Sequence, residues 1–203
     1  DEPEIVEAVH RDYIEAGAKV LTLNTYSATP ERLARDGIED RFEALQAKAI
    51  EIAKKARGDE RITIAGCLPP LIGSYHPELT PEYETCLATY RRICAVQNAA
   101  VDVFLCETLS SVKEIKAAVT AAAETDKPVW CGMSAVDQDG SQLRSGEKLA
   151  DGVTAAHEAE AAALLINCSW PEAVTQAMPW LAKSGLPFGG YANGFKNAAE
   201  LES

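Results

Sequence analysis

The sequence predicts an α/β fold of the (β/α)8 barrel type that lacks its first strand and its last strand-helix unit. Short β-branched apolar runs alternate with amphipathic segments along all 203 residues. Each run is continuously hydrophobic, as is typical of parallel strands buried on both faces. A helix precedes the first run, and six strands leave two of a barrel's eight without a counterpart. No GxGxxG or GxxxxGK[ST] turn occurs, which disfavours a doubly wound sheet.

The six predicted strands follow one another at intervals suited to repeated strand-helix units. They cover residues 19–26, 61–70, 101–108, 128–135, 163–170 and 187–194. A six-stranded piece would leave two unpaired edges and an open core. We therefore expect residues 1–203 to form one barrel domain that is incomplete at both ends, completed by further chain or by another partner.

Six helices are predicted between the strands, from apolar residues that recur at spacings of three and four. One example is Ile115, Ala118 and Val119. Ser110 resembles a helix start and Gly58 a helix stop. The predicted helices cover residues 3–18, 38–58, 80–100, 111–125, 152–162 and 171–185.

Composition excludes several classes of protein. The chain has 31 acidic against 19 basic residues, a net charge of −12, and no basic stripe that could bind nucleic acid. No apolar run reaches the roughly 18 to 20 residues that span a bilayer, and the acidic start is unlike a signal peptide. We expect a soluble, cytoplasmic protein without membrane or nucleic-acid partners. Its oligomeric state is not predicted.

Cysteine usage agrees with a reducing compartment. Four of the six cysteines (Cys67, Cys106, Cys131 and Cys168) fall within or at the end of apolar strand-like runs. Disulfide scaffolds are usually shorter and richer in loops. We therefore expect buried, reduced thiols.

The candidate functional residues are those at the carboxyl ends of the strands, where barrels carry their chemistry. This set is polar, rich in thiols and nearly free of cations. Lys19 and Lys127 stand at strand beginnings, which disfavours a Schiff-base aldolase. The candidates are Asn24, Tyr26, Cys67, Cys106, Glu107, Thr108, Ser134, Asp137, Asn167, Cys168, Ser169, Tyr191 and Asn193.

Glu107 is the strongest of these candidates apart from the cysteines. A carboxylate that follows an apolar strand is costly to bury without a cation or several donors. The alternative is a cap on the helix that starts near Ser110. Asn24 and Tyr26 are predicted to line the pocket, against turn and core-packing alternatives, and Ser134 and Asn193 are weaker candidates for the same role.

The remaining cysteines and the histidines have structural interpretations. Cys67, Cys106 and Cys131 are expected to pack in the core, because cysteine is commonly a small buried apolar residue. The three histidines, His10, His76 and His157, lie in helices or a loop and have no partner at metal-ligand spacing.

Four segments in one order, 10–39, 101–119, 131–149 and 164–174, resemble the homocysteine S-methyltransferase family. Their most specific strings are NTYSATPERL, VFLCETLSS, CGMSAVDQDG and LLINCSWPEAV. The resemblance implies a zinc-dependent (β/α)8 enzyme that transfers a methyl group from S-methylmethionine or S-adenosylmethionine to homocysteine, giving methionine. It also implies that Cys168 is a catalytic zinc ligand and that Glu107 recognises the amino group of homocysteine.

The sequence departs from the family pattern in three places. The family's zinc site needs an adjacent Cys-Cys pair near its end, whereas no cysteine follows Cys168 here. The family's early Asp-Gly turn is absent, and residues 68–78 differ from the Gly-Pro-Tyr-Gly type of loop, so the donor could differ. We expect truncation or disorder, rather than a degenerate enzyme, to explain the first two, since they coincide with the missing strands.

Two other functions stay open. One is a phosphate-binding barrel isomerase or synthase that uses a Gly189-Gly190 loop. The other is a non-catalytic barrel remnant that acts as an interaction module. Betaine or a methylated corrinoid or folate is an alternative donor within the wider family.

Overall fold

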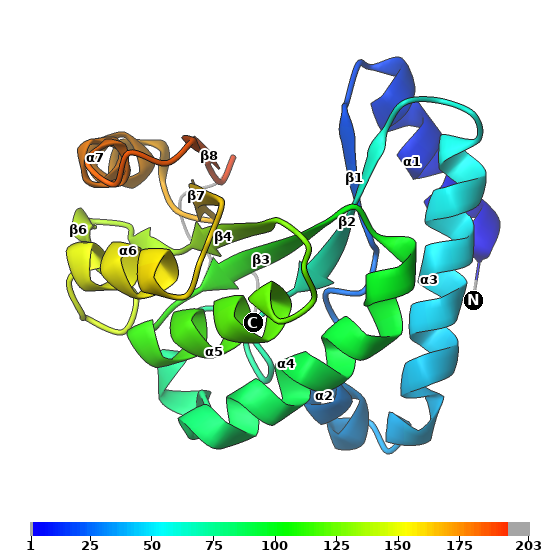
Figure 1. Cartoon of the computed structure of the whole chain (residues 1–203), viewed down its shortest axis with the longest axis horizontal. Helices are drawn as coiled ribbons and strands as arrows, with labels where there is room; N and C mark the ends of the chain where they lie inside the picture. The colour runs from blue at the N-terminus through cyan, green and yellow to red at the C-terminus, as the bar shows by residue number, and fades with distance from the viewer. Residues whose placement is uncertain (1, 195–203) are drawn as a thin grey trace.

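A curved sheet of six parallel strands forms the centre of the computed structural model, which describes residues 2–194. The strands are hydrogen-bonded in the order in which they occur along the chain, as in a (β/α)8 barrel (Figure 1). The barrel-type fold is thus confirmed, with a sheet that is open between β1 and β8. The strands are β1 (Val20–Thr22), β2 (Thr63–Leu68), β3 (Val103–Leu109), β4 (Val129–Met133), β7 (Ala163–Asn167) and β8 (Phe188–Tyr191).

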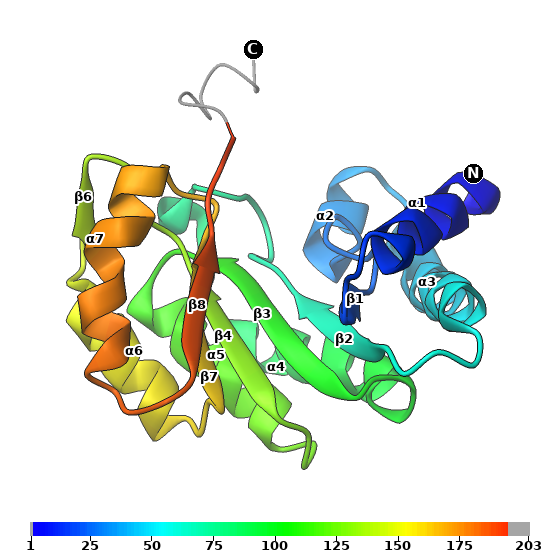
Figure 2. The same ribbon diagram turned by 90° about the horizontal axis from the view of Figure 1, so that it is seen from above.

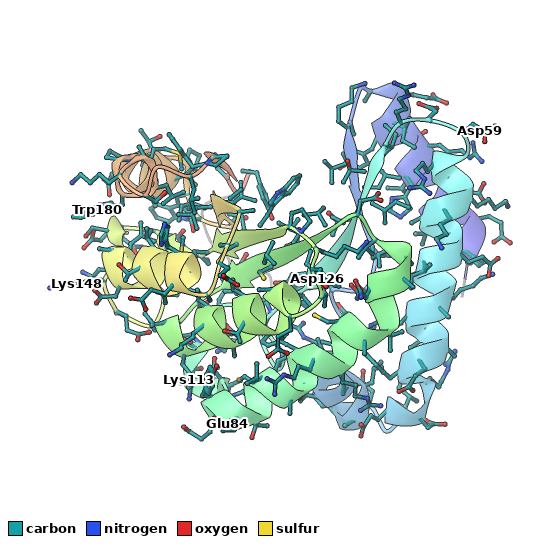
Figure 3. All side chains as sticks on the ribbon, in the orientation of Figure 1. Asp59, Glu84, Lys113, Asp126, Lys148 and Trp180 are labelled. Carbon is teal, nitrogen blue, oxygen red and sulfur yellow. The ribbon has the colours of Figure 1, made fainter. Side chains whose placement is uncertain are left out.

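The helices cover the outer, convex side of this sheet, as Figures 1 and 2 show. All six predicted helices are present, and each is shorter than predicted. Their bounds are α1 (Pro3–Glu15), α3 (Phe42–Arg57), α4 (Tyr83–Gln97), α5 (Val112–Ala123), α6 (Leu149–Glu158) and α7 (Pro171–Ala182). Helix α6 also begins three residues earlier than predicted. The cap of α5 is Ser111, whose side chain accepts from the Glu114 backbone N–H, one residue later than predicted. Charged side chains such as Glu84 and Lys148 lie on the outside (Figure 3).

A short helix and a two-stranded hairpin were not predicted. The short helix α2 (Pro30–Arg35) is capped by Thr29, but six residues are too few to show a helical period. A two-stranded antiparallel hairpin, β5 (Ala135–Val136) and β6 (Asp139–Leu143), follows β4 outside the main sheet. The hairpin sequence is mostly polar and contains no long apolar run. The predicted strand 128–135 was wrong in its last two residues, because β4 ends at Met133 and Ala135 belongs to β5. Three 3-10 turns, η1 (Glu39–Arg41), η2 (Pro77–Leu79) and η3 (Asn98–Ala100), complete the elements.

Alternation along the strands separates two cores. Phe104 and Cys106 point outward into the large cluster beneath the helices, whereas Val103 and Leu105 belong to a small cluster on the inner face of the sheet. Glu107, two residues beyond Leu105, therefore faces the concave side. The same alternation places Cys131 in the outer core.

All six cysteines are unpaired, as predicted, and five of them are buried. Cys168 is the partly exposed one. Within residues 2–194, no helix combines the length and the apolar character needed to cross a membrane.

Glu114 is a buried carboxyl group in α5 and lies beneath the strand ends. Burial raises its pKa to about 7, and hydrogen bonds from the Ser110 and Leu71 backbone N–H groups offset part of this shift. The Tyr90 hydroxyl, 3.4 Å away, already donates to the Pro69 carbonyl at 2.9 Å. Its second, longer contact is with Glu114 Oε1, to which it also donates, and this contact lowers the pKa of Glu114 in part.

Glu114→Gln should remove a pH dependence of stability. The folded pKa lies above the ordinary value of 4.5, so this group's contribution is complete below about pH 4.5 and is lost as the pH rises through about 7. The advantage of the glutamine variant in free energy of unfolding should grow by about 2 to 3 kcal/mol between about pH 5 and pH 8. Urea unfolding at several pH values measures it. Glu84→Gln, on the exposed face of α4, is the control, and an equal slope for both variants would contradict the assignment.

Candidate functional site

A cavity of about 480 Å³ lies between α1 and β1, at the open edge of the sheet, and reaches Cys67 of β2 and Glu107 of β3. Its polar lining includes Asn24, Tyr26, Cys67 and Glu107. Three of these four were predicted to be site residues. Cys67 was predicted to pack in the core and is indeed buried, but it also lines this cavity beside Glu107.

Glu107 is held in the cavity wall by two groups from other strands. The Tyr191 hydroxyl donates to Oε1 at 3.2 Å, and the Cys67 thiol points at Oε2 from 3.8 Å. Burial raises the pKa of the Glu107 carboxyl, and the contacts with Tyr191 and Cys67 lower it in part. Because Ser111 caps α5, the helix-cap alternative for Glu107 is wrong. The carboxylate has no cationic partner among these contacts.

Cys168 follows β7 directly, in a left-handed backbone conformation with a φ of 52°. Two donors point at its sulfur, the Asn167 amide nitrogen at 3.1 Å and the Thr108 hydroxyl at 3.4 Å. Asn167 and Thr108 also hold each other, because Thr108 N donates to Asn167 Oδ1 at 3.0 Å and Asn167 Nδ2 donates to Thr108 Oγ1 at 2.8 Å. The sulfur is therefore fixed as a hydrogen-bond acceptor.

Gly132 makes this arrangement possible. A Cβ atom at this position would lie 2.7 Å from the Cys106 carbonyl oxygen and 3.0 Å from Asn167 Oδ1. Such contacts are too close for a real side chain, so the glycine leaves room for the Asn167 side chain to reach Thr108.

Two tyrosines complete the rim. The Tyr26 hydroxyl lies 2.8 Å from Ser74 Oγ, and burial raises the pKa of Tyr26. Tyr75, in the loop after β2, hydrogen-bonds with Asn193 and Cys168, and burial together with the nearby Cys168 sulfur raises the pKa of Tyr75 to about 12. Tyr75 has a φ of 64°, and nothing in the local sequence indicated its role.

The other predicted pocket residues have different outcomes. Asn24 is exposed and lines the rim, whereas Asn193 is half-buried and reaches Tyr75. Ser134 is fully buried, and its hydroxyl accepts from Arg144 Nε at 2.7 Å. Because Arg144 covers the Ser134 side chain, Ser134 holds Arg144 in place and does not line the pocket.

Two arginines from outside the strand-end set lie close to the predicted residues. Arg144 lies next to Cys168, and its Nη2 donates to the Cys168 carbonyl oxygen at 2.9 Å. Arg32 lies over the Tyr26 ring at 5.3 Å. Arg32 lies in α2 and Arg144 directly follows β6, so neither belongs to the strand ends that the sequence pointed to.

The described residues do not supply a three-sulfur metal site. In residues 2–194 no three histidine, cysteine, aspartate or glutamate side chains come together in a way that could hold a metal ion. Cys168 is the one thiol at the rim beside the Asn167-Thr108 pair.

The Gly189-Gly190 segment is part of β8 and not an anion-binding loop. Gly189 pairs with Leu165 and Gly190 with Ile166 in the parallel ladder with β7. A side chain at Gly190 would meet the Ile166 carbonyl at 2.7 Å, so this glycine serves close strand packing. The structural basis of the phosphate-site alternative is therefore absent from this segment.

The sequence matches the model of one known protein family over almost its whole length. The family model described as homocysteine S-methyltransferase matches residues 1–202. The chain belongs to the homocysteine S-methyltransferase family.

Homocysteine S-methyltransferase relatives are found in bacteria and plants. The Escherichia coli homocysteine S-methyltransferase is 30% identical over 200 residues, which cover 89% of this chain and 64% of that protein. Homocysteine S-methyltransferase YbgG of Bacillus subtilis is 30% identical over 191 residues, with 83% and 60% covered. The chain thus spans less than two thirds of the length of these relatives.

Solved structures show the same fold. The metallated form of the homocysteine methyltransferase MmuM from Escherichia coli superposes with a TM-score of 0.77 at 24% identity, covering 97% of this chain and 82% of that one. Its oxidized form gives 0.78 at 25%, with 100% and 86% covered. The similarity supports the barrel architecture of the family.

Proposed function

We propose that this chain carries the homocysteine site of an enzyme that methylates homocysteine to methionine. The proposed donor is a sulfonium compound, S-methylmethionine or S-adenosylmethionine. The observation that carries the proposal is a juxtaposition: Tyr191 donates its hydroxyl to Glu107, while its carbonyl accepts from the Cys168 backbone N–H at 3.3 Å. One strand thus joins a carboxylate and a thiol at the rim of a barrel of this family.

Glu107 is the proposed anchor for the substrate ammonium group. Its side chain is half-buried with no cation among its contacts, and this burial raises its pKa. An ammonium group in contact with it would supply the missing charge and form a charge-assisted hydrogen bond. Asn24, Tyr26 and Asn193 are proposed to contact the substrate around this anchor, since Asn24 and Tyr26 line the cavity and Asn193 approaches Cys168 through Tyr75.

Cys168 is the proposed zinc ligand, and the described residues alone do not fit the three-sulfur set that the family resemblance implies. No cysteine follows Cys168 in the sequence, and Cys67, Cys106 and Cys131 are buried. Further ligands would therefore have to come from outside these 203 residues. For Cys168 itself we propose one task, which is to present its sulfur to the metal in the orientation set by Asn167 and Thr108.

The chemistry consists of one substitution at a methyl carbon. The bond between the methyl group and the positive donor sulfur breaks, and its electron pair stays on the departing neutral thioether. The homocysteine sulfur, after losing its proton, forms the new carbon-sulfur bond. Alignment of the two sulfurs and exclusion of water supply much of the rate in such reactions. The cavity beside Glu107 is the proposed place for this alignment.

A direct assay tests the proposed function. Full-length protein is incubated with zinc, homocysteine and either donor carrying a 13C-labelled methyl group. We expect labelled methionine to form only when homocysteine is present. If neither donor gives labelled methionine while homocysteine still protects the protein against heat, the chain is a binding module. If neither turnover nor protection occurs, the proposed site is wrong.

A further inference from the structure

An ion pair on the β5-β6 hairpin lies directly behind the Cys168 turn. Asp137 lies in the hairpin turn and Arg144 follows β6. Their side chains form two parallel contacts, 3.2 Å from Nη1 to Oδ2 and 3.0 Å from Nη2 to Oδ1. Only 12% of the Asp137 side chain and 13% of the Arg144 side chain is exposed. Such bidentate pairs are geometrically specific.

The pair holds the segment that contains Cys168 from both ends. Arg144 Nη2 donates to the Cys168 carbonyl oxygen at 2.9 Å, and the Trp170 backbone N–H donates to Asp137 Oδ1 at 2.9 Å. Arg144 Nε also donates to Ser134 Oγ at 2.7 Å, and the Ser134 hydroxyl lies 3.4 Å from the same Cys168 carbonyl. These hydrogen bonds thus reach the main chain on both sides of Cys168, at its own carbonyl and at the Trp170 N–H, and the Ser134 hydroxyl beside it.

The turn needs such support because of its backbone conformation. Cys168 has a φ of 52°, a region that costs energy for a residue with a Cβ atom. A residue keeps this conformation only when its surroundings hold it there. If the Cys168 backbone relaxed to a negative φ, the Cα-Cβ bond would point in another direction and the sulfur would move away from Asn167 and Thr108. Arg144 also stacks on the Tyr75 ring at 4.5 Å, so the ring that approaches Cys168 is held by the same guanidinium.

We propose that the Asp137-Arg144 pair is a positioning device for the Cys168 thiol. This inference rests on the proposed function for the use of the thiol, although the geometry that it explains does not. The pair carries no net charge, so its action is to place the turn and the sulfur. Loss of either partner should then have the same effect, whereas an electrostatic role would give effects of opposite sign.

Alkylation of Cys168 tests the proposal without any enzyme assay. The other five cysteines are buried, so limited treatment with iodoacetamide followed by peptide mass mapping reports on Cys168 and uses the others as an internal check of folding. Arg144→Gln and Asp137→Asn should each raise the alkylation rate of Cys168 by about tenfold, because the sulfur leaves its shielded position. Arg144→Lys, which keeps the charge but not the fork, should behave like Arg144→Gln.

The matched control is Arg91→Gln, which removes an exposed bidentate pair with Glu124 on the outer helices and should leave the rate unchanged. Rates within twofold of the wild type in both Arg144→Gln and Asp137→Asn, or changes of opposite sign, would overturn the proposal. Labelling of all six cysteines at similar rates would show that a variant is unfolded. In that event the alkylation rate of Cys168 is measured on Arg144→Lys at a lower temperature, and the same criteria apply.

Methyl transfer provides the second readout. In an active protein, Arg144→Gln should lower kcat roughly 10- to 100-fold, the cost of misplacing a reacting group by about 1 Å, with the KM for homocysteine nearly unchanged because Glu107 is untouched. If wild-type protein shows no methyl transfer, the proposed function fails while the alkylation result still stands. If alkylation is unchanged in the variants but methyl transfer is intact in the wild type, only the positioning role fails.

Discussion

Cys168→Ser should abolish methyl transfer and lower zinc retention in full-length protein. A serine hydroxyl is a poor zinc ligand compared with a thiolate, and Asn167 and Thr108 would hold an oxygen where the sulfur now lies. Loss of a direct ligand should cost more than the roughly 10- to 100-fold in metal affinity or activity that follows loss of an outer-shell partner. Zinc content per chain and methionine formation, measured on the same preparation, check this result.

The control for Cys168→Ser is Cys131→Ala, which alters a fully buried thiol in the outer core. We expect normal zinc content and turnover in this variant, with a loss of about 1 kcal/mol in stability because a small cavity opens. A Cys168→Ser protein that keeps one zinc per chain and near-normal turnover would show that Cys168 is not a ligand.

Glu107→Gln should lower kcat/KM for homocysteine by roughly 10- to 1000-fold, equivalent to about 1.5 to 4 kcal/mol for a lost charged hydrogen bond in a buried site. The amide keeps the shape of the side chain and can still accept from Tyr191, so the loss reports on charge. Burial raises the pKa of Glu107, and only its ionised form can pair with an ammonium group. The kcat/KM of the wild type should therefore fall as the pH drops through this raised pKa, and the glutamine variant should lack that acidic limb.

Glu124→Gln is the control, since it removes a carboxylate that pairs with Arg91 on the surface and should leave kcat/KM unchanged. The anchor role would be wrong if Glu107→Gln had normal kinetics and a lower melting temperature. Such a result would assign Glu107 to the support of Tyr191.

The sequence predicted the repeated part of the fold well because burial imposes a period on it. The run from Val103 to Cys106 is apolar on both faces, so it indicated a parallel strand, and the carboxylate that follows it, Glu107, indicated the site. The β5-β6 hairpin was missed because its strands carry polar residues, and hydrogen bonds from Ser141 and Gln142 to Asp139 stabilise it without an apolar run. Local pattern could not reveal it.

The site was predicted in part. The residues at the strand ends could be predicted, but the side chains that hydrogen-bond with them could not. Cys168 and Asn167 follow from the end of β7, yet the contacts of Arg144 reach residues 7 and 24 positions away, and no pattern in the sequence links them. Ser134 was expected to contact substrate because its position in the strand is right. Its side chain is covered by Arg144, which only the folded chain can show.

The open sheet has a consequence for how the chain behaves in solution. Within residues 2–194, β1 and β8 each pair on one side only, and apolar side chains near them are exposed, among them Tyr13 at 63%, Phe188 at 47% and Ile5 at 56%. Unpaired edges beside apolar surface are templates for strand pairing between molecules. The net charge of −12 keeps copies apart, but salt screens this repulsion to a range of about 8 Å at 0.15 M. We therefore expect a protein made of residues 1–203 alone to aggregate more readily as the ionic strength rises, which light scattering at several salt concentrations would measure.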